Sequence, residues 1–157
     1  MANMVLNIAL GQVAGYYRRV DENDPSTAEL YVIVFNTGAA DSVIRDLDTI
    51  AAIEADASTA EVTNSGYARK ALTDADLTAF AADDTNDRVD LVIADQTFTA
   101  VAAGTAWTDV CIAYGLNGGA DSAKVPLTWH DFAVTPNGGD ITVDVPAAGF
   151  YRATSAT

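Results

Sequence analysis

Few residues in this chain of 157 have the chemistry of a catalytic centre. The single histidine, His130, precedes Asp131 in the run TWHDF, and a histidine with an orienting carboxylate can act as a general base. On a strand, however, neighbouring side chains point to opposite faces, so Asp131 would not orient His130. The sequence also lacks a G-x-S-x-G nucleophile motif. We therefore expect a structural His130 and predict no catalytic residue.

The sequence predicts neither a reactive thiol nor a metal site. Cys111 lies in the apolar run VCIAY, which is typical of a small buried side chain. One cysteine and one histidine do not make a zinc ligand set. The acidic stretch 83–90 offers carboxylates for calcium, but counting from Asp84 puts Arg88 fifth and Val89 sixth, which breaks the EF-hand pattern. We expect a solvated acidic loop, leave calcium as the open alternative, and predict no metal and no cofactor.

Two glycine pairs and two tryptophans have structural interpretations as well. The runs 117–119 and 137–139, both Asn-Gly-Gly, are not followed by Lys-Ser/Thr, so they predict hairpin turns and not phosphate loops. Trp107 and Trp129 could stack on a sugar, but a tryptophan among strand residues more often packs in the core.

The charge of the chain excludes several classes of partner. Its 22 acidic and 8 basic residues give a net charge of −14. Such a surface repels phosphate, so we expect no binding to nucleic acid or to an anionic membrane. The first residues lack the basic start of a secretory signal, and no apolar run approaches the ~18 residues of a membrane helix. We expect a soluble protein made in a cytoplasm.

The hydrophobic pattern predicts a single domain over residues 1–157, mainly β. Its N-terminal segment, 1–60, should contain a short helix within 4–20, a strand at 29–35 that is buried on both faces, and a helix at 46–56 capped by Asp46 or Asp48. The β-rich core, 61–157, has further strand-like runs separated by Gly, Asn and Pro turns, at 89–95, 96–102, 107–116, 127–135 and 141–154. This rhythm predicts an antiparallel β-sandwich, jelly-roll-like or barrel-like, with one or two short helices in the N-terminal half.

The stretch NSGYARK (64–70) concentrates two of the few cations beside an aromatic ring. Its first three residues predict a turn that leads into a strand, on which Tyr67 and Arg69 would share one face and Lys70 the other. We interpret the stretch as a structural corner in which Arg69 pairs with surplus carboxylates. Contact with a partner is the alternative, and further candidates for either role are Trp107, Tyr151 and Arg152.

Several runs along the chain resemble, in the same order, small structural proteins of tailed bacteriophages. They are NIALGQVAGYYRRVDENDPSTAELYVIV, NSGYARKALTDADL, NDRVDLVIADQTFTA, PLTWHDFAVTPNGGDITV and GFYRAT. The chain looks most like the head decoration, or cement, proteins of cyanophage-type phages. The resemblance covers nearly the whole chain, although each motif alone is short.

The resemblance implies a function without catalysis. A cement protein binds the outside of the mature head and bridges neighbouring major capsid subunits, commonly as a dimer or trimer whose weak contacts add up to avidity. It would be made in the host cytoplasm and end on the outer capsid surface. The alternative is a tail or fibre component that touches the host, through sugar at Trp107 or Trp129 or through Tyr16 and Tyr17. An enzyme or a small-molecule binder would rest on His130 and Cys111 alone.

Overall fold

Two antiparallel strands of ten residues form the centre of the fold. The computed structural model describes residues 3–155, and in it β2 (Ala28–Thr37) pairs with β7 (Trp107–Leu116) along nearly their whole length. Both strands are rich in β-branched and aromatic residues and are buried on both faces. A strand buried on both faces must have a layer of structure on each side.

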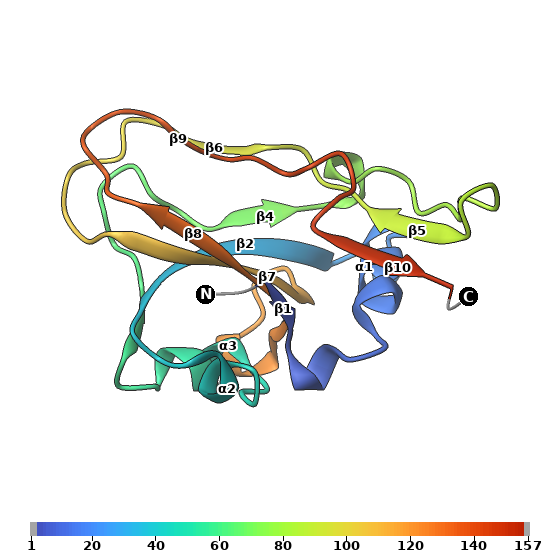
Figure 1. The fold of residues 1–157 in the computed structure, drawn as a ribbon, viewed down its shortest axis with the longest axis horizontal. Helices are drawn as coiled ribbons and strands as arrows, with labels where there is room; N and C mark the ends of the chain where they lie inside the picture. Colours follow the sequence, from blue (N-terminus) through green and yellow to red (C-terminus); the bar gives the residue numbers. More distant parts are fainter. Residues whose placement is uncertain (1–2, 156–157) are drawn as a thin grey trace.

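These strands belong to a six-stranded sheet in the order β1-β8-β7-β2-β3, with β4 also paired to β2 (Figure 1). All its pairings are antiparallel. The remaining strands of this sheet are β1 (Met4–Val5), β8 (Val125–Val134), β3 (Thr59–Glu61) and β4 (Lys70–Leu72). The short β3 and β4 share one edge of β2, because β3 pairs with the end of β2 and β4 with its beginning.

One face of this sheet packs under a helix and two small antiparallel ladders. Leu30, Val32 and Val34 of β2 point to this face, together with Val110 and Ile112 of β7. The covering elements are α1 (Val13–Asp21), the ladder of β5 (Arg88–Leu91) with β10 (Tyr151–Thr154), and the ladder of β6 (Gln96–Phe98) with β9 (Ile141–Val143).

The opposite face packs under two short helices, α2 (Asp41–Ile44) and α3 (Ile50–Glu54), and under Leu6, which directly precedes the 3-10 turn η1 (Asn7–Ala9). Tyr31, Ile33 and Phe35 of β2 point to this side, where Phe35 stacks on Trp129 at 5.1 Å between ring centroids. Two more 3-10 turns, η2 (Asp74–Asp76) and η3 (Asp121–Ala123), lie in the connections. The result is a mainly β, β-sandwich-like fold.

Most of the expected elements are confirmed. The strand at 107–116 has the predicted bounds, the strand at 29–35 extends to 28–37, and the helix within 4–20 is α1. Residues from both parts of the chain, 1–60 and 61–157, contribute to one sheet and to the same clusters of buried residues. None of the described helices is long and apolar enough to cross a bilayer.

Other expectations were wrong in detail. The barrel-like alternative fails because the sheets do not close. The helix expected at 46–56 is only α3, capped by the Thr49 side chain, which accepts from the N–H of Ala52, and not by an aspartate. The helix α2 was not predicted, since it has only four residues. The run 141–154 divides into β9 and β10, because these two strands pair with different partners.

Neither glycine pair forms a tight hairpin turn. Residues 117–119 begin an eight-residue connection that includes η3, so β7 and β8 are antiparallel neighbours joined by a longer loop. Residues 137–139 join β8 to β9, and these strands lie in different sheets. Gly138 and Gly139 instead bond the backbone of Val101. The local turn chemistry was recognised, but the partner of each strand depends on distant residues.

Candidate functional site

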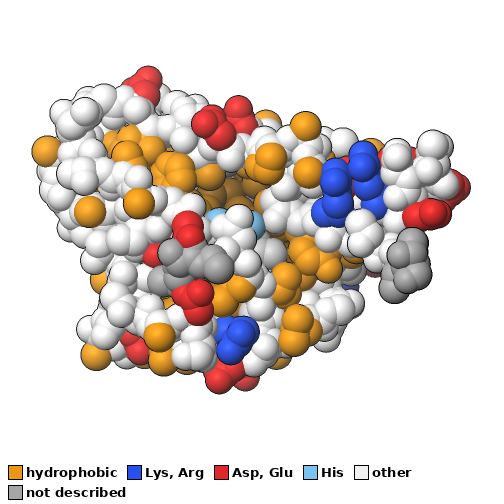
Figure 2. All heavy atoms as spheres, in the orientation of Figure 1, with side chains coloured by type: hydrophobic (Ala, Val, Ile, Leu, Met, Phe, Trp, Pro, Cys, Tyr) orange, Lys and Arg blue, Asp and Glu red, His pale blue; other side chains and the backbone are white. Residues whose placement is uncertain are grey.

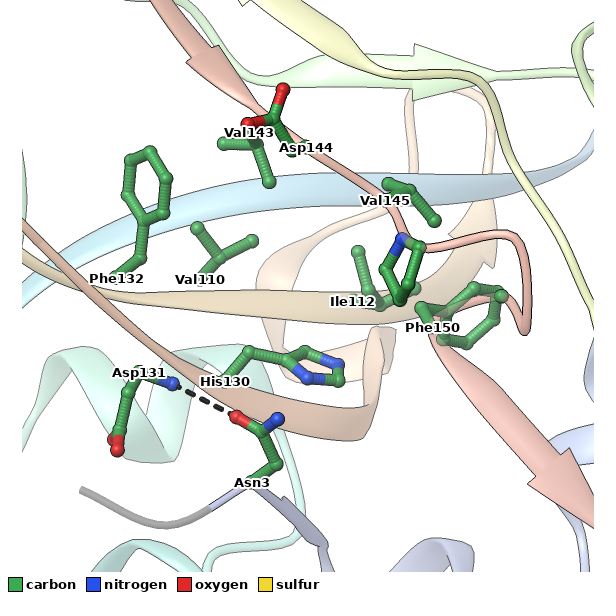
Figure 3. Close-up of a pocket in the computed structure, with 12 residues that line it drawn as sticks. Asn3, Val110, Ile112, His130, Asp131, Phe132, Val143, Asp144, Val145 and Phe150 are labelled. Atoms are coloured by element: carbon green, nitrogen blue, oxygen red, sulfur yellow. Dashed lines mark hydrogen bonds between the residues drawn. The ribbon is translucent and has the colours of Figure 1, made fainter.

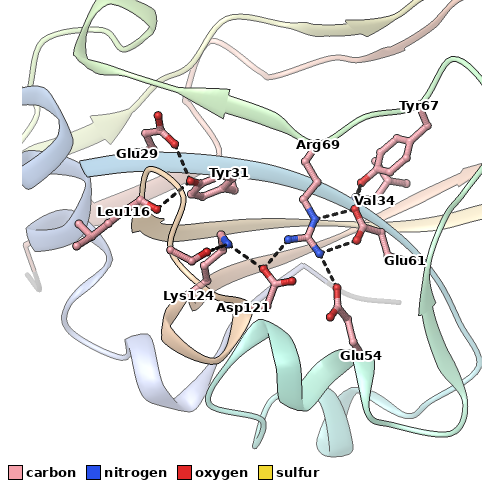
Figure 4. Close-up of polar contacts among 11 residues, drawn as sticks. Glu29, Tyr31, Val34, Glu54, Glu61, Tyr67, Arg69, Leu116, Asp121 and Lys124 are labelled. Atoms are coloured by element: carbon pink, nitrogen blue, oxygen red, sulfur yellow. Dashed lines mark hydrogen bonds and ion pairs between the residues drawn. The ribbon is translucent and has the colours of Figure 1, made fainter. Parts of the chain in front are cut away.

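Arg69 ties together carboxylates from three parts of the chain (Figure 4). Its Nε donates to Oε1 of Glu61 at 2.8 Å and its Nη2 to Oε2 of the same carboxylate at 2.6 Å, a bidentate pair. Its Nη1 donates to Oδ1 of Asp121 at 2.6 Å, and Nη2 also reaches Glu54. Because these partners lie on β3, η3 and α3, the guanidinium cross-links three elements, and its side chain is only 23% exposed.

The electrostatics of this corner are those of a structural ion cluster. The hydrogen bond with Glu61 raises the pKa of Arg69 against the effect of burial, so the guanidinium stays charged. Burial favours a higher pKa for Asp121, but hydrogen bonds from Arg69 and Lys124 outweigh it and leave that pKa lowered. Burial raises the pKa of Glu54 despite the nearby Arg69. Since its donors already bond three carboxylates, Arg69 has little capacity for a further ligand.

Tyr67 supports the same corner from the other side. Its hydroxyl accepts from the N–H of Val34 at 3.1 Å and donates to Oε1 of Glu61 at 2.7 Å. Its ring meets Trp107 edge-on at 5.6 Å between centroids. The expected interpretation of a structural corner with Arg69 bound to carboxylates therefore agrees with the geometry. The strand assignment was wrong, because β4 begins only at Lys70 and so Tyr67 and Arg69 precede it.

The corner continues into a buried polar chain that the sequence did not suggest. Lys124 donates to Oδ1 of Asp121 at 2.9 Å, and its ammonium lies 5.0 Å from the centroid of the Tyr31 ring. The Tyr31 hydroxyl donates to Oε2 of Glu29 at 2.6 Å, and Asn117 donates to the other oxygen of Glu29. These contacts fasten the long β7–β8 connection to the sheet.

Of the remaining candidates, Trp107 contacts this corner through the ring of Tyr67. Trp107 is completely buried and donates its indole N–H to Asn64 at 3.1 Å, so contact with a partner is excluded for it in this fold. Lys70 lies over the Phe98 ring at 5.0 Å from its centroid. Tyr151 and Arg152 are on β10, where Tyr151 packs against the core and the Arg152 guanidinium pairs with the carboxylate of Asp90 on β5.

A hollow of about 220 Å³ opens over the face formed by β7 and β8 (Figure 3). Its lining is mostly apolar: Val110 and Ile112 from β7, Phe132 from β8, and Val145 and Phe150 from the segment between β9 and β10. In the space-filling view the hollow lies near the middle of the face, with hydrophobic side chains and the histidine at its bottom (Figure 2). The sequence analysis did not predict this hollow, because its walls come from four separated parts of the chain: β7, β8, residues 143–150 and Asn3.

His130 is one of the polar residues that line this hollow. Burial lowers the pKa of the imidazole, against the opposing effect of Asp131, so the ring is neutral at pH 7. Its Nε2 is 2.8 Å from Oγ1 of Thr128, but Thr128 is 1% exposed and cannot attack a substrate. The Asp131 carboxylate points away from the ring (Figure 3). The geometry thus agrees with the prediction that Asp131 does not orient His130.

Cys111 and the acidic loop have structural surroundings. Cys111 is fully buried, as predicted, and burial raises the pKa of its thiol. In the acidic loop, the Asp83 carboxylate accepts from the side chain of Asn86 at 2.7 Å and from the backbone of Thr85 and Asn86. Among residues 3–155, no group of three or more His, Cys, Asp or Glu side chains is placed to hold a metal ion.

Asp109 is a buried carboxylate that the sequence analysis missed. It is the third residue of β7 and has no exposed surface, and its Oδ1 accepts from the indole N–H of Trp129 at 2.9 Å. Its Oδ2 has no hydrogen-bond partner within the described part of the chain. Burial raises its pKa, since the charged form is poorly solvated there. The signal was a lone acidic residue inside the apolar run WTDVCIAY.

The comparisons with known proteins identify no relative. No protein-family model matches the chain, and no curated protein and no solved structure is significantly similar to it. Function must therefore be argued from the residues themselves. The described structure offers a polar corner suited to support and a mostly apolar hollow suited to binding.

Proposed function

We propose that the chain is a virion structural protein, a decoration protein that binds the outside of a mature phage head and bridges major capsid subunits without catalysis. The observation that carries the proposal is the resemblance of five ordered runs, spread over nearly the whole chain, to small structural proteins of tailed phages. Because the comparisons add no relative, the proposal rests on these runs and on physical arguments.

Three physical features support a binding role on a shell. The central strands are buried on both faces, which makes a stiff core that can bear load. Arg69 and Lys124 anchor connections to that core, so the loops that contact a shell would be held in place. The charge of −14 would keep free copies and decorated heads from clumping. On the head, a dimer or trimer would combine several weak contacts.

The proposal is tested by mixing the purified protein with expanded heads that lack it and sedimenting the heads. We expect saturable co-sedimentation at a fixed ratio to the major capsid protein. Unexpanded precursor heads provide the matched control, because a decoration protein should prefer the expanded shell. Failure to bind mature heads at any protein concentration would refute the proposal.

The alternative of a tail or fibre component loses most of the aromatic side chains that suggested it. Trp107, Trp129 and Tyr17 are fully buried, and the ring of Tyr16 packs against Tyr114 at 4.6 Å between centroids. The three buried rings therefore provide no open sugar platform. Immunogold labelling of virions separates the two locations: label over the head supports decoration, and label on the tail supports the alternative.

A further inference from the structure

The hollow over β7 and β8 is large enough to hold one aromatic ring. An apolar protein cavity of roughly 150 Å³ accepts benzene, whereas sites for drug-sized ligands occupy roughly 300–1,000 Å³. The hollow, at about 220 Å³, lies between these sizes. Its bottom is formed by Val110 and Ile112, and Val145 and Phe150 close one side (Figure 3). An aromatic side chain would fill it, and a larger molecule would protrude.

The His130 ring also presents a polar atom to the hollow. Nε2 of His130 bonds Thr128, but Nδ1 of the same ring has no hydrogen-bond partner within residues 3–155. A neutral imidazole with one nitrogen engaged presents a single donor or acceptor at the other. A phenol hydroxyl fits either case, because it can donate and accept. The site therefore favours a ring with a polar tip over a purely apolar ring.

The rim of the hollow is acidic. Asp144 lies beside Val143 and Val145, is exposed, and makes no hydrogen bond or ion pair within the described residues. Figure 2 shows acidic side chains on both sides of the hollow. A second copy of this chain would bring its own net charge of −14 to this surface. Charge complementarity therefore favours a basic partner.

We propose that this hollow is a docking site for a tyrosine-like side chain carried on a basic segment of a partner protein. The inference rests on the proposed function in one respect: on a phage head, the partner would be the major capsid protein. The partner's ring would lie on Val110 and Ile112 with its hydroxyl at His130, and its cations would face Asp144.

The first test uses p-cresol as the probe for a tyrosine side chain. We expect saturable NMR shifts of the Val110, Ile112 and Val145 methyl groups and of the His130 ring. Toluene, which lacks the hydroxyl, should bind about fivefold more weakly, as expected for one hydrogen bond. Val145→Trp should fill the hollow and abolish the shifts. Shifts that are absent, or that persist in V145W, would overturn the site.

The second test measures binding to expanded heads. Val145→Trp should reduce head binding by at least about tenfold, the effect of losing a central anchor. Asp144→Lys should reduce it about threefold at low salt, while the matched control Asp84→Lys, an exposed carboxylate outside the hollow, should bind as the unchanged protein does. Melting temperatures check that each variant folds, and D144K still tests the proposal if V145W does not fold.

The outcomes separate the two proposals. If the unchanged protein binds heads and both variants bind equally well, the docking site is refuted and the decoration function stands. If p-cresol binds but V145W leaves head binding intact, the hollow accepts a free small aromatic molecule and the proposed protein partner is wrong. If the unchanged protein binds no heads while p-cresol binds as expected, the decoration function fails.

Discussion

The guanidinium of Arg69 is shared by Glu54, Glu61 and Asp121, so its removal leaves three half-buried carboxylates close together without a cation. Breaking a buried ion pair costs about 3–5 kcal/mol, and partial exposure reduces this cost. We expect Arg69→Ala to lower the free energy of unfolding by about 2 kcal/mol, measured by urea denaturation.

A matched control is available on α1. Arg18 pairs with Glu22 four residues along, and both side chains are about half exposed. Arg18→Ala should cost less than about 0.5 kcal/mol. If R69A is no more destabilising than R18A but weakens head binding, Arg69 is a partner contact and its structural assignment is wrong.

Asp109 should make the free energy of unfolding depend on pH, and its raised pKa determines the sign of that dependence. Burial raises the pKa of Asp109 in the folded state. At pH values just above the ordinary carboxyl pKa, Asp109 is therefore protonated more often in the folded protein than in the unfolded chain. The contribution of Asp109 to the free energy of unfolding therefore falls as pH rises through that window. Asp109→Asn removes this titration, so we expect it to stabilise the protein by about 1 kcal/mol at pH 7 and to have little effect near pH 3. Urea denaturation at several pH values measures this difference.

The alanine variant separates charge from hydrogen bonding. Asp109→Ala leaves the buried indole N–H of Trp129 without its acceptor, which should cost about 1–3 kcal/mol at every pH. A destabilised D109N at neutral pH would show that the carboxylate is better solvated than its complete burial implies.

The turn that leads into β10 depends on a glycine. Gly149 has φ +76°, and a Cβ there would lie 2.0 Å from the carbonyl oxygen of Leu91 on β5. Gly138 has φ +98° with nothing within 4 Å of its Cβ position. Gly138→Ala should cost about 1 kcal/mol for backbone strain alone, and Gly149→Ala about 3 kcal/mol because the clash is added.

Thermal unfolding compares these two glycine variants directly. Equal losses would mean that the β5–β10 ladder moves aside without cost. In that case the β5–β10 ladder would be only weakly packed against the sheet. The ion pair between Arg152 and Asp90 would then contribute little to holding the ladder in place.

For the whole molecule, net charge governs self-association. Copies that each carry −14 repel one another in dilute salt. If the protein forms dimers or trimers in solution, we expect the association constant to rise between about 20 mM and about 500 mM salt, as screening shortens the range of repulsion. Sedimentation velocity measures this change. Association that weakens with salt would instead indicate an interface dominated by ion pairs.

The sequence by itself determined the two central strands. Runs such as ELYVIVF and WTDVCIAYGL are strands because β-branched and aromatic side chains favour the extended backbone, and their continuous apolar character correctly predicted burial on both faces. The residue types around Arg69 also predicted a cation paired with carboxylates. Composition likewise established the acidic surface, since charge is additive along the chain.

Only the tertiary structure decided which segments meet. The partners of Arg69 are 8, 15 and 52 positions away, and the walls of the hollow come from β7, β8, residues 143–150 and Asn3. The different pairing of β9 and β10 likewise follows from strands far away in sequence. The physical reason is that pairing and packing are long-range choices, made by the fit of whole faces, whereas propensity and turn chemistry act over only a few residues.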